Sequence, residues 1–573
     1  MAQDAPVIAE DAAAPDAPAP ADTVFVGGRV FTASGPAPIE AAVAVGGGRI
    51  VAVTDEASVR RLVGRDTEVV DLAGGLLVPG FQDAHVHPAV AGVQLLRCDL
   101  SAERSVDGYL AAVAGYAEAN PGAPWICGGG WSMDVFPGGV PTRAMLDRVV
   151  PDRPVLLTNR DGHGAWVNSV ALRLAGVDRD TPDPADGRIE READGSPAGT
   201  LQEGAMDLVA AHVPVATPEE AHAGLLVAQQ HLFSLGVTSW QDAMIGAFPG
   251  NPDNYQVYLR AAQDGSLRAR VVGALWWDRE RGLEQLPELE ERRRGGRVGR
   301  FSATTVKIMQ DGIAENFTAS MLEPYLDRCG CPTQNSGLTF VGPQLLADAV
   351  CALDRAGFQV HFHALGDRAV REALDALAAA RAANGPSDNR HHLAHLQVIH
   401  PDDLPRFAEL GATANIQALW AAHEPQMDEL TIPFLGPQRA ALQYPFGDLR
   451  RAGARLAAGS DWSVSSPNPL WGIHVAVNRA VPVDAPNAAA DHEPRAPFYP
   501  AQALTLAEAL TAYTAGSAWV NHLDEVTGTV EVGKHADLVV LDRDPFEHPA
   551  EEIGRTRVLR TYIDGRAVFT ATA

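Results

Sequence analysis

The segment LLVPGFQDAHVHP, residues 76–88, decides how this chain is interpreted. It is an apolar run broken by a Pro-Gly turn, and it ends in His85 and His87. Side chains two residues apart on a strand face the same side, so both imidazoles would project together from the strand's end. An H-x-H pair alone is weak evidence for a metal site, but its place after an apolar strand strengthens that interpretation.

Seven further apolar runs follow this segment, with helical patterns between most of them. The expected strands cover 235–243, 268–277, 304–312, 358–366, 390–398, 412–420 and 455–464. Eight strand–helix units predict an α/β fold of the (β/α)8 TIM-barrel type. The stretch from about 89 to 216 is too long for one connection, and we expect it to form an insertion that caps the barrel mouth.

Both ends of the chain are rich in β-type sequence with Gly turns. We expect residues 23–75 and 498–573 to form one small β-sandwich domain built from both termini. The barrel domain with its cap would then occupy residues 76–497. Residues 1–22 are dominated by Ala, Pro and Asp, which predicts a disordered tail.

The composition excludes several classes of function. The chain has 573 residues with 45 Lys and Arg against 72 Asp and Glu, a formal net charge of −27. This charge argues against nucleic acid and anionic membranes as partners. Five cysteines cannot form a disulfide framework, and no secretory signal or apolar span of 18 residues is present. A reduced, cytoplasmic location is therefore predicted.

Polar residues follow the predicted strands at the ends where barrel enzymes place their chemistry. They come after strands one, four, five, six and eight: His85, His87, Lys307, His361, His363, His391, His392, His395 and Asp461. A single histidine or aspartate at such a place is usually structural, but five successive positions together are not explained that way. Imidazole, carboxylate and carbamate are ligands that suit zinc and similar ions.

Several longer motifs resemble the amidohydrolase superfamily, and within it amidohydrolase family 3, which includes N-substituted formamide deformylases. The motifs are GFQDAHVHP, GGGWSMDVFPGGVPTRAMLD, RPVLLTNRDGHGAWVNSVAL, TTVKIMQDG, VHFHALGDRAV, HHLAHLQ, GSDWSV and GTVEVGKHADLVVLDRDPF. The resemblance extends from about residue 23 to the end of the chain. It implies a distorted barrel that holds one or two divalent metals, with zinc as the expected ion.

The resemblance also implies which residues hold the metal. The matched ligands are His85, His87, Lys307, His363, His395 and Asp461. In related enzymes the lysine is carboxylated and bridges two metals. His361 is an alternative to His363, and His391 and His392 fall upstream of the family position. Ala394 stands where relatives usually carry an acidic residue, so metal affinity or number can differ here.

From these residues we hypothesise metal-assisted hydrolysis of a C–N amide-type bond, in an N-acyl or N-formyl amide of small size. A metal-activated water would attack the carbonyl, with Asp461 as the proton shuttle and His163 as a hydrogen-bond donor to the carbonyl or oxyanion. The expected pocket residues are Trp131, Asp134, Asn168, Gln417 and Trp462. Hydrolysis of a carbamate, cyclic amide or ester remains open, as does a catalytically inactive barrel used for binding. A homodimer is considered as the assembly.

Overall fold

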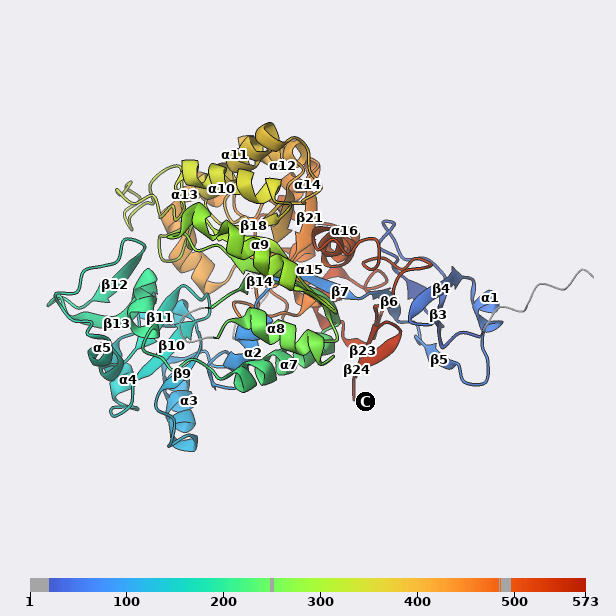
Figure 1. Cartoon of the computed structure of the whole chain (residues 1–573), viewed down its shortest axis with the longest axis horizontal. Helices are drawn as coiled ribbons and strands as arrows, with labels where there is room; N and C mark the ends of the chain where they lie inside the picture. The colour runs from blue at the N-terminus through green and yellow to red at the C-terminus, as the bar shows by residue number, and fades with distance from the viewer. Residues whose placement is uncertain (1–19, 248–251, 484, 486–495, 573) are drawn as a thin grey trace, which may run out of the picture.

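The computed structural model describes residues 20–247, 252–483, 485 and 496–572 of the chain (Figure 1). The tail predicted to be disordered covers residues 1–22. Residues 1–19 of it lie outside the described residues. Its last residues run into the first strand, β1, which starts at Thr23.

Eight parallel strands form the central barrel, in the order in which they follow one another along the chain. They are β7 (Phe81–Val86), β14 (Val237–Ile245), β15 (Arg270–Trp276), β17 (Phe301–Met309), β18 (Gln359–Ala364), β19 (His392–His395), β20 (Thr413–Ile416) and β21 (Arg455–Ala458). The short strand β16 (Arg297–Val298) pairs with β17 outside this path. The predicted TIM barrel is confirmed, strand by strand.

Hydrogen bonds at the carboxyl ends of the first and last strands bring the barrel close to closure. The amide of Asp461 donates to the carbonyl of His85 at 2.8 Å, and the amide of His87 donates to the carbonyl of Trp462 at 2.9 Å. Asp83 adds a side-chain link, since its Oδ1 accepts from the amides of His85 and Ser460, each at 3.0 Å. The residues that carry the candidate ligands are thus fixed against each other by backbone contacts.

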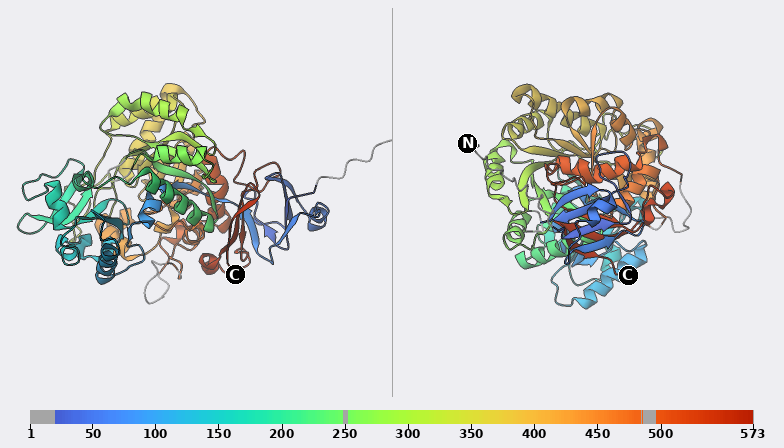
Figure 2. Two further views of the ribbon diagram at one scale, coloured as in Figure 1. Left: turned by 60° about the horizontal axis from the view of Figure 1, so that its bottom comes forward. Right: turned by 90° about the vertical axis from the view of Figure 1, so that its right-hand side faces the viewer.

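Helices between the strands cover the outside of the barrel (Figures 1 and 2). They include α7 (Pro218–Ser234), α8 (Asn254–Gln263), α9 (Leu286–Gly295), α10 (Pro343–Arg355), α11 (Asp367–Asn384), α12 (Leu404–Leu410), α14 (Phe446–Arg451) and α15 (Pro469–Asn478). Thr217 starts α7 with a capping box that pairs it with Glu220. On α10, Leu346, Val350 and Leu353 are buried at helical spacing, which is why this segment packs on the sheet.

The capping insertion has its own six-stranded sheet, in the order β12-β13-β11-β10-β9-β8. These strands are β8 (Cys98–Asp99), β9 (Ile126–Trp131), β10 (Val155–Asn159), β11 (Gly164–Val167), β12 (Gly187–Arg191) and β13 (Pro197–Glu203). The helices α3 (Val106–Ala119), α4 (Arg143–Asp147) and α5 (Ser169–Ala175) pack with it. Figures 1 and 2 show the cap at one end of the molecule and the terminal β-domain at the other.

Two small sheets at the opposite end combine both ends of the chain. One has the order β4-β3-β1-β5 and the other β2-β6-β22-β23-β24. Their strands are β1 (Thr23–Val26), β2 (Arg29–Val30), β3 (Ala42–Gly46), β4 (Arg49–Thr54), β5 (Glu68–Asp71), β6 (Leu76–Pro79), β22 (Leu538–Leu541), β23 (Val558–Ile563) and β24 (Arg566–Thr570). Buried residues from both, such as Phe25 and Tyr562, share one apolar cluster.

Several details differ from the expected segments. The last three strands end at His395, Ile416 and Ala458 rather than at 398, 420 and 464. The run 76–88 is two strands rather than one, because β6 belongs to the terminal domain and the chain passes into the barrel at Gly80. A Cβ at Gly80 would lie 2.3 Å from Oγ1 of Thr238, so only glycine fits this crossing. Residues following 498 first form α16 (Leu506–Thr511) and α17 (Ser517–Val520), and Leu510 packs in the barrel core rather than in the β-domain.

All five cysteines are free thiols in the structure, which agrees with the expectation that no disulfide framework forms. Within the part of the chain that the structure describes, no helix is both long enough and apolar enough to span a bilayer.

Candidate metal centre

Three side chains converge where β7 and β21 end. Nε2 of His87 lies 2.9 Å from Oδ1 of Asp461, and Nε2 of His85 lies 3.3 Å from the same oxygen. One ligand atom from each of the three lies within 4.8 Å of the others. Oδ1 accepts no hydrogen bond from the described residues, so this is a convergence of electron-pair donors around one point. Such an arrangement suits a cation.

Lys307 reaches the same point from β17. Its Nζ lies 3.4 Å from Nε2 of His85, and its side chain is buried. Burial lowers the pKa of this amine to about 7, against the opposing effect of Asp461. A lysine in this position is therefore partly neutral near neutral pH, and a neutral amine is the form that reacts with carbon dioxide.

His363 and His395 lie beside this group, at the ends of β18 and β19. Their ring centroids are 4.4 Å apart, and Nδ1 of His395 lies 3.8 Å from Oδ2 of Asp461. Nε2 of His363 donates to the carbonyl of Gly312 at 3.3 Å, which leaves its Nδ1 without a proton. Neither ring nitrogen of the buried His395 has a hydrogen-bond partner among the described residues.

These side chains fit a divalent metal ion. Buried polar atoms without partners are costly, and they are rare unless something else satisfies them. Three of these side chains, His87, His395 and Asp461, have such an atom. The six residues matched by the sequence, His85, His87, Lys307, His363, His395 and Asp461, all lie in this group.

The protonation states also suit ligands, which must be deprotonated to bind. Burial lowers the pKa of His85 to about 3, and it lowers the pKa of His363 and His395 well below the usual value. Burial alone would raise the pKa of Asp461, but the neighbouring His85 and His87 hold it well below its usual range. His85, His363 and His395 are therefore neutral imidazoles beside the ionised carboxylate of Asp461.

A chain of hydrogen bonds fixes the tautomer of His85. Gln359 Nε2 donates to the carbonyls of Arg390 and Val520, so its Oε1 can only accept, and it does so from Nε2 of Gln241 at 3.0 Å. The Oε1 of Gln241 then accepts from Nδ1 of His361 at 2.6 Å.

The consequence reaches the metal centre. With its proton on Nδ1, His361 has a lone pair on Nε2, which accepts from Nδ1 of His85 at 2.9 Å. The Nε2 of His85 is thereby left with a lone pair that faces Asp461 and Lys307. His361 is thus a support for a ligand rather than the alternative to His363 that the sequence left open.

His392 and His391 also lie apart from the ligand group. His392 accepts at Nδ1 from Nδ2 of Asn415, at 3.2 Å, and its Nε2 contacts Oε1 of Gln241 at 3.1 Å. His391 lies further out, with Nε2 3.1 Å from Oδ1 of Asp354. Gln241 and Asn415 are functional positions that sequence reasoning missed, because amides inside apolar strands carry no local motif.

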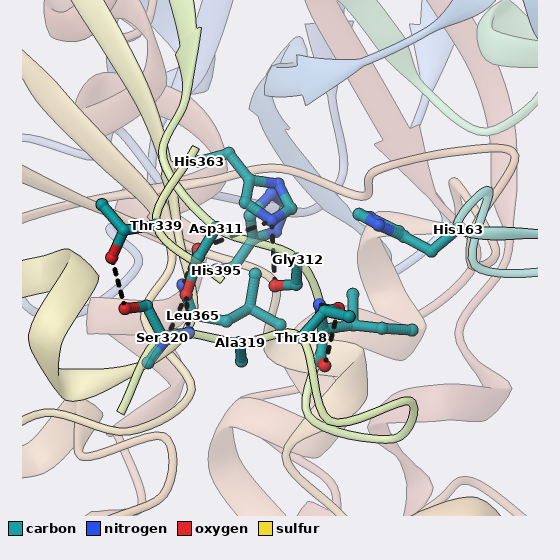
Figure 3. A network of polar contacts seen from close by, with 12 residues as sticks. His163, Asp311, Gly312, Thr318, Ala319, Ser320, Thr339, His363, Leu365 and His395 are labelled. Carbon is teal, nitrogen blue, oxygen red and sulfur yellow. Dashed lines mark hydrogen bonds and ion pairs between the residues drawn. The ribbon is translucent and has the colours of Figure 1, made fainter. Parts of the chain in front are cut away.

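Asp311 braces the loops that follow β17 and β18 (Figure 3). Its carboxylate accepts from the amides of Ser320 at 2.9 Å, Leu365 at 3.1 Å and Gly366 at 2.8 Å. Burial raises the pKa of Asp311 to about 8, so the three amide donors oppose a large desolvation cost. This brace positions the backbone around His363, and it explains the Asp-Gly pair after strand four.

A cavity of about 270 Å³ lies between the cap and the metal centre. Its wall includes Arg160, Asp161 and His163 from the cap and His363 and Asp461 from the barrel. This volume is near the lower end of the range for small-molecule sites, about 300–1,000 Å³. Cap residues therefore form part of the cavity wall, together with candidate ligands of the barrel.

His163 lies at the wall of this cavity, opposite His363. Their ring centroids are 5.5 Å apart, and Figure 3 shows the two rings on facing segments. Nδ1 of His163 lies 2.8 Å from Oε2 of Glu203. Burial alone would lower the pKa of His163, but the Glu203 carboxylate more than offsets it, and the pKa is raised. His163 is therefore suited to donate a proton or a hydrogen bond.

Two of the expected pocket residues pack inside the cap instead. Trp131 is fully buried in the cap core, where its indole donates to the carbonyl of Leu157 at 2.8 Å. Asn168 caps α5 and also accepts from the amide of Val155 at 3.1 Å. Neither residue is among those that line the cavity.

Of the other three, only Trp462 lines the cavity. Asp134 accepts from the hydroxyl of Ser132. Gln417 accepts from the amide of His395 at 2.6 Å, so it supports a candidate ligand from behind. The cavity wall also holds Glu315, which sequence reasoning did not single out.

Comparison with known proteins places these observations in a family. The family model described as Amidohydrolase family matches residues 68–569. The chain is 32% identical over 562 residues to Protein LONG AFTER FAR-RED 3 of Arabidopsis thaliana, covering 96% of this chain and 92% of the relative. It is 28% identical over 559 residues to N-substituted formamide deformylase of Arthrobacter pascens, covering 95% and 97%.

A solved structure supports the same relationship. The crystal structure of an uncharacterized metal-dependent hydrolase from Pyrococcus furiosus superposes with a TM-score of 0.68 at 26% sequence identity. The match covers 91% of this chain and 99% of that chain. The likeness therefore includes the cap and the terminal β-domain as well as the barrel.

Proposed function

This chain belongs to the amidohydrolase family of metal-dependent hydrolases, and from that premise we propose that it cleaves the C–N bond of a small N-formyl or N-acyl amide. The observation that carries the proposal is the convergence of His85, His87 and Asp461 beside a cavity whose wall includes Asp461. The similarity to an N-substituted formamide deformylase supports this bond type over others.

We propose zinc as the ion, held by the six residues of the centre. Their nitrogen and oxygen donors suit zinc, and the described cysteines lie elsewhere in the fold. When bound, a divalent ion supplies Lewis acidity, which acidifies water and polarises a carbonyl. Carboxylation of Lys307 is part of the proposal, supported by its burial and by a pKa of about 7.

In this proposal Asp461 acts first as the general base and then as the general acid. Its carboxylate is ionised and reaches the cavity wall, so it can accept the proton that the attacking water loses. It then returns that proton to the leaving nitrogen, and the C–N bond breaks to give a carboxylic acid and a neutral amine. A role of this kind contributes about 10²–10⁴-fold to the rate.

His163 acts on the opposite side of the cavity. Its Nδ1 faces Glu203, so Nε2 is the atom left to donate to the substrate carbonyl oxygen as negative charge develops there. His163 is itself largely buried, and a hydrogen bond is electrostatically stronger where it is shielded from water.

The walls of the cavity define the class of substrate. Trp420, Trp462 and Trp471 line it together with Leu419 and Met427. Aromatic and aliphatic surface of this kind favours an apolar substituent on the amide nitrogen. The cavity volume, about 270 Å³, admits a compact molecule.

The proposal is tested with a substrate panel on zinc-loaded protein. The panel contains 4-nitroformanilide, 4-nitroacetanilide, a phenyl carbamate, a cyclic imide and 4-nitrophenyl acetate. We expect turnover of an anilide, with an Asp461→Asn variant slower by at least about 10²-fold. Activity on the carbamate, imide or ester alone would reassign the bond, and no activity after zinc or manganese loading would overturn the proposal.

A cytoplasmic location and a homodimer stay predictions. Light scattering coupled to gel filtration would measure the assembly, and fractionation of the source cells would measure the location.

A further inference from the structure

Glu203 joins the cap to the barrel beside the cavity. It is the last residue of β13, and its two carboxylate oxygens bind different parts of the molecule. Oε2 lies 2.8 Å from Nδ1 of His163 in the cap. Oε1 accepts from Oγ1 of Thr318 at 2.6 Å and from Nδ2 of Asn316 at 3.3 Å, both in the barrel loop after β17.

The side chain of Glu203 is tightly packed, and its backbone conformation is unusual. Glu203 is only 8% exposed, and its backbone has φ +50° and ψ −131°, a conformation that non-glycine residues rarely adopt. At the neighbouring Gly312, a Cβ would lie 2.4 Å from Oε1 of Glu203 and 2.0 Å from Oγ1 of Thr318. Strain and lack of space both indicate that the carboxylate is held in one place.

The barrel loop that Glu203 contacts also contacts the metal centre. The carbonyl of Gly312 accepts from Nε2 of His363 (Figure 3). Thr318, a few residues further on, donates to Glu203. A single carboxylate therefore connects a cap histidine with the loop that supports a candidate ligand.

We propose that Glu203 is a positioning residue that holds His163 over the reacting carbonyl and sets this position by its bond to Thr318 of the barrel. The inference rests on the proposed function, because His163 acts on a substrate only if the site is hydrolytic. It goes beyond that function by making the cap-to-barrel contact a condition for catalysis. When the cap is displaced, Glu203 loses Thr318, and His163 loses its fixed place.

The test compares substitutions at the two ends of this link. Glu203→Leu removes all three contacts of the carboxylate, whereas Glu203→Gln keeps an oxygen that can accept from His163. Thr318→Val removes the shorter of the two barrel contacts, and Thr318→Ser restores the hydroxyl. Glu190→Leu is the matched control, because Glu190 is a cap carboxylate that pairs only with Arg188 in the described structure.

The kinetic readout is kcat and KM on the best substrate of the panel, with bound zinc and Tm measured on the same samples. Orienting carboxylates of this kind contribute about 10–100-fold. We expect Glu203→Leu and Thr318→Val to lower kcat by about that factor with KM and zinc content unchanged. Glu203→Gln and Thr318→Ser should recover part of the loss, and Glu190→Leu should match the wild type.

A double variant shows whether Glu203 works through His163. If it does, Glu203→Leu combined with His163→Asn is no slower than His163→Asn alone. Losses that multiply, or a Glu203→Leu kcat within twofold of the wild type, would overturn the inference while leaving the proposed function intact.

A crystal structure of Glu203→Leu gives an answer that does not depend on activity. We expect the His163 ring to leave its position opposite His363. A ring that stays in place would overturn the inference, whatever the activity of the wild type. Failure of the wild type to hydrolyse any substrate of the panel would count against the proposed function alone.

Discussion

Replacing His361 with phenylalanine should weaken metal binding although His361 is not a ligand. The substitution keeps a flat ring of similar size in the core but removes the acceptor at Nε2, which holds the proton of His85 on Nδ1 at 2.9 Å. His85 can then move its proton to Nε2 and donate it to Oδ1 of Asp461, 3.3 Å away. That state must be undone before His85 can bind an ion.

The size of the effect follows from this competition. A hydrogen bond to a charged group is worth about 1.5–3 kcal/mol, and this is the stabilisation that the competing tautomer gains. At about 1.4 kcal/mol for each tenfold change, zinc affinity should fall by roughly 10–100-fold. The same range is typical when residues that orient metal-binding histidines are lost, so the two estimates agree.

The assay is competition for zinc against a chelator of known affinity, with His391→Phe as the matched control. His391 also makes two hydrogen bonds, to Asp354 and from the amide of Val360, but neither reaches the metal centre. We expect His391→Phe to lower Tm and leave the zinc Kd unchanged. A His361→Phe protein with the wild-type Kd, or an equal loss in both variants, would refute the reasoning.

Three further predictions concern stability, metal content and pH. Gly312→Ala should lower the free energy of unfolding in urea by about 1–3 kcal/mol, because its Cβ would lie 2.0 Å from Oγ1 of Thr318. Gly342→Ala is the control, since its Cβ would meet no atom within 4 Å, and its free energy of unfolding should change little. Lys307→Met should reduce zinc per chain in elemental analysis, and unchanged content would remove Lys307 from the site. Burial raises the pKa of Asp354, but its hydrogen-bond partners outweigh this and hold it below the usual value. Its carboxylate therefore stabilises the fold above about pH 4 and loses this effect as pH falls through the folded pKa. The difference in the free energy of unfolding in urea between the wild type and Asp354→Asn should be smaller at pH 3 than at pH 7. A difference that stays constant would contradict this prediction.

The barrel could be predicted from sequence because each strand is a short local signal. Alternation in period two also placed His85 and His87 on one side of their strand, and the structure brings both to Asp461. Exact strand ends were harder to predict, because the apolar runs continue past the point where the last three strands end, at His395, Ile416 and Ala458. The break at Gly80 was not predictable, because its cause is contact with Thr238, far along the chain.

The supporting residues could not be predicted in the same way. His361 and His85 are 276 positions apart, and nothing in either segment reports that their rings meet. Trp131 shows a related difficulty, since an aromatic residue in a Gly-rich loop gives the same sequence signal whether it lines a pocket or lies in the core of a cap. Glu203 lacks any motif, since its importance arises from contacts with two separate segments.

The central claim is that a metal ion binds at the mouth of the barrel between the first and last strands. Anomalous diffraction at the zinc edge, on crystals of zinc-loaded protein, tests it most directly. We expect a peak at about 2.0–2.1 Å from Nε2 of both His85 and His87, with Asp461 as a further ligand. A peak elsewhere, or no peak at full zinc loading, would contradict the account.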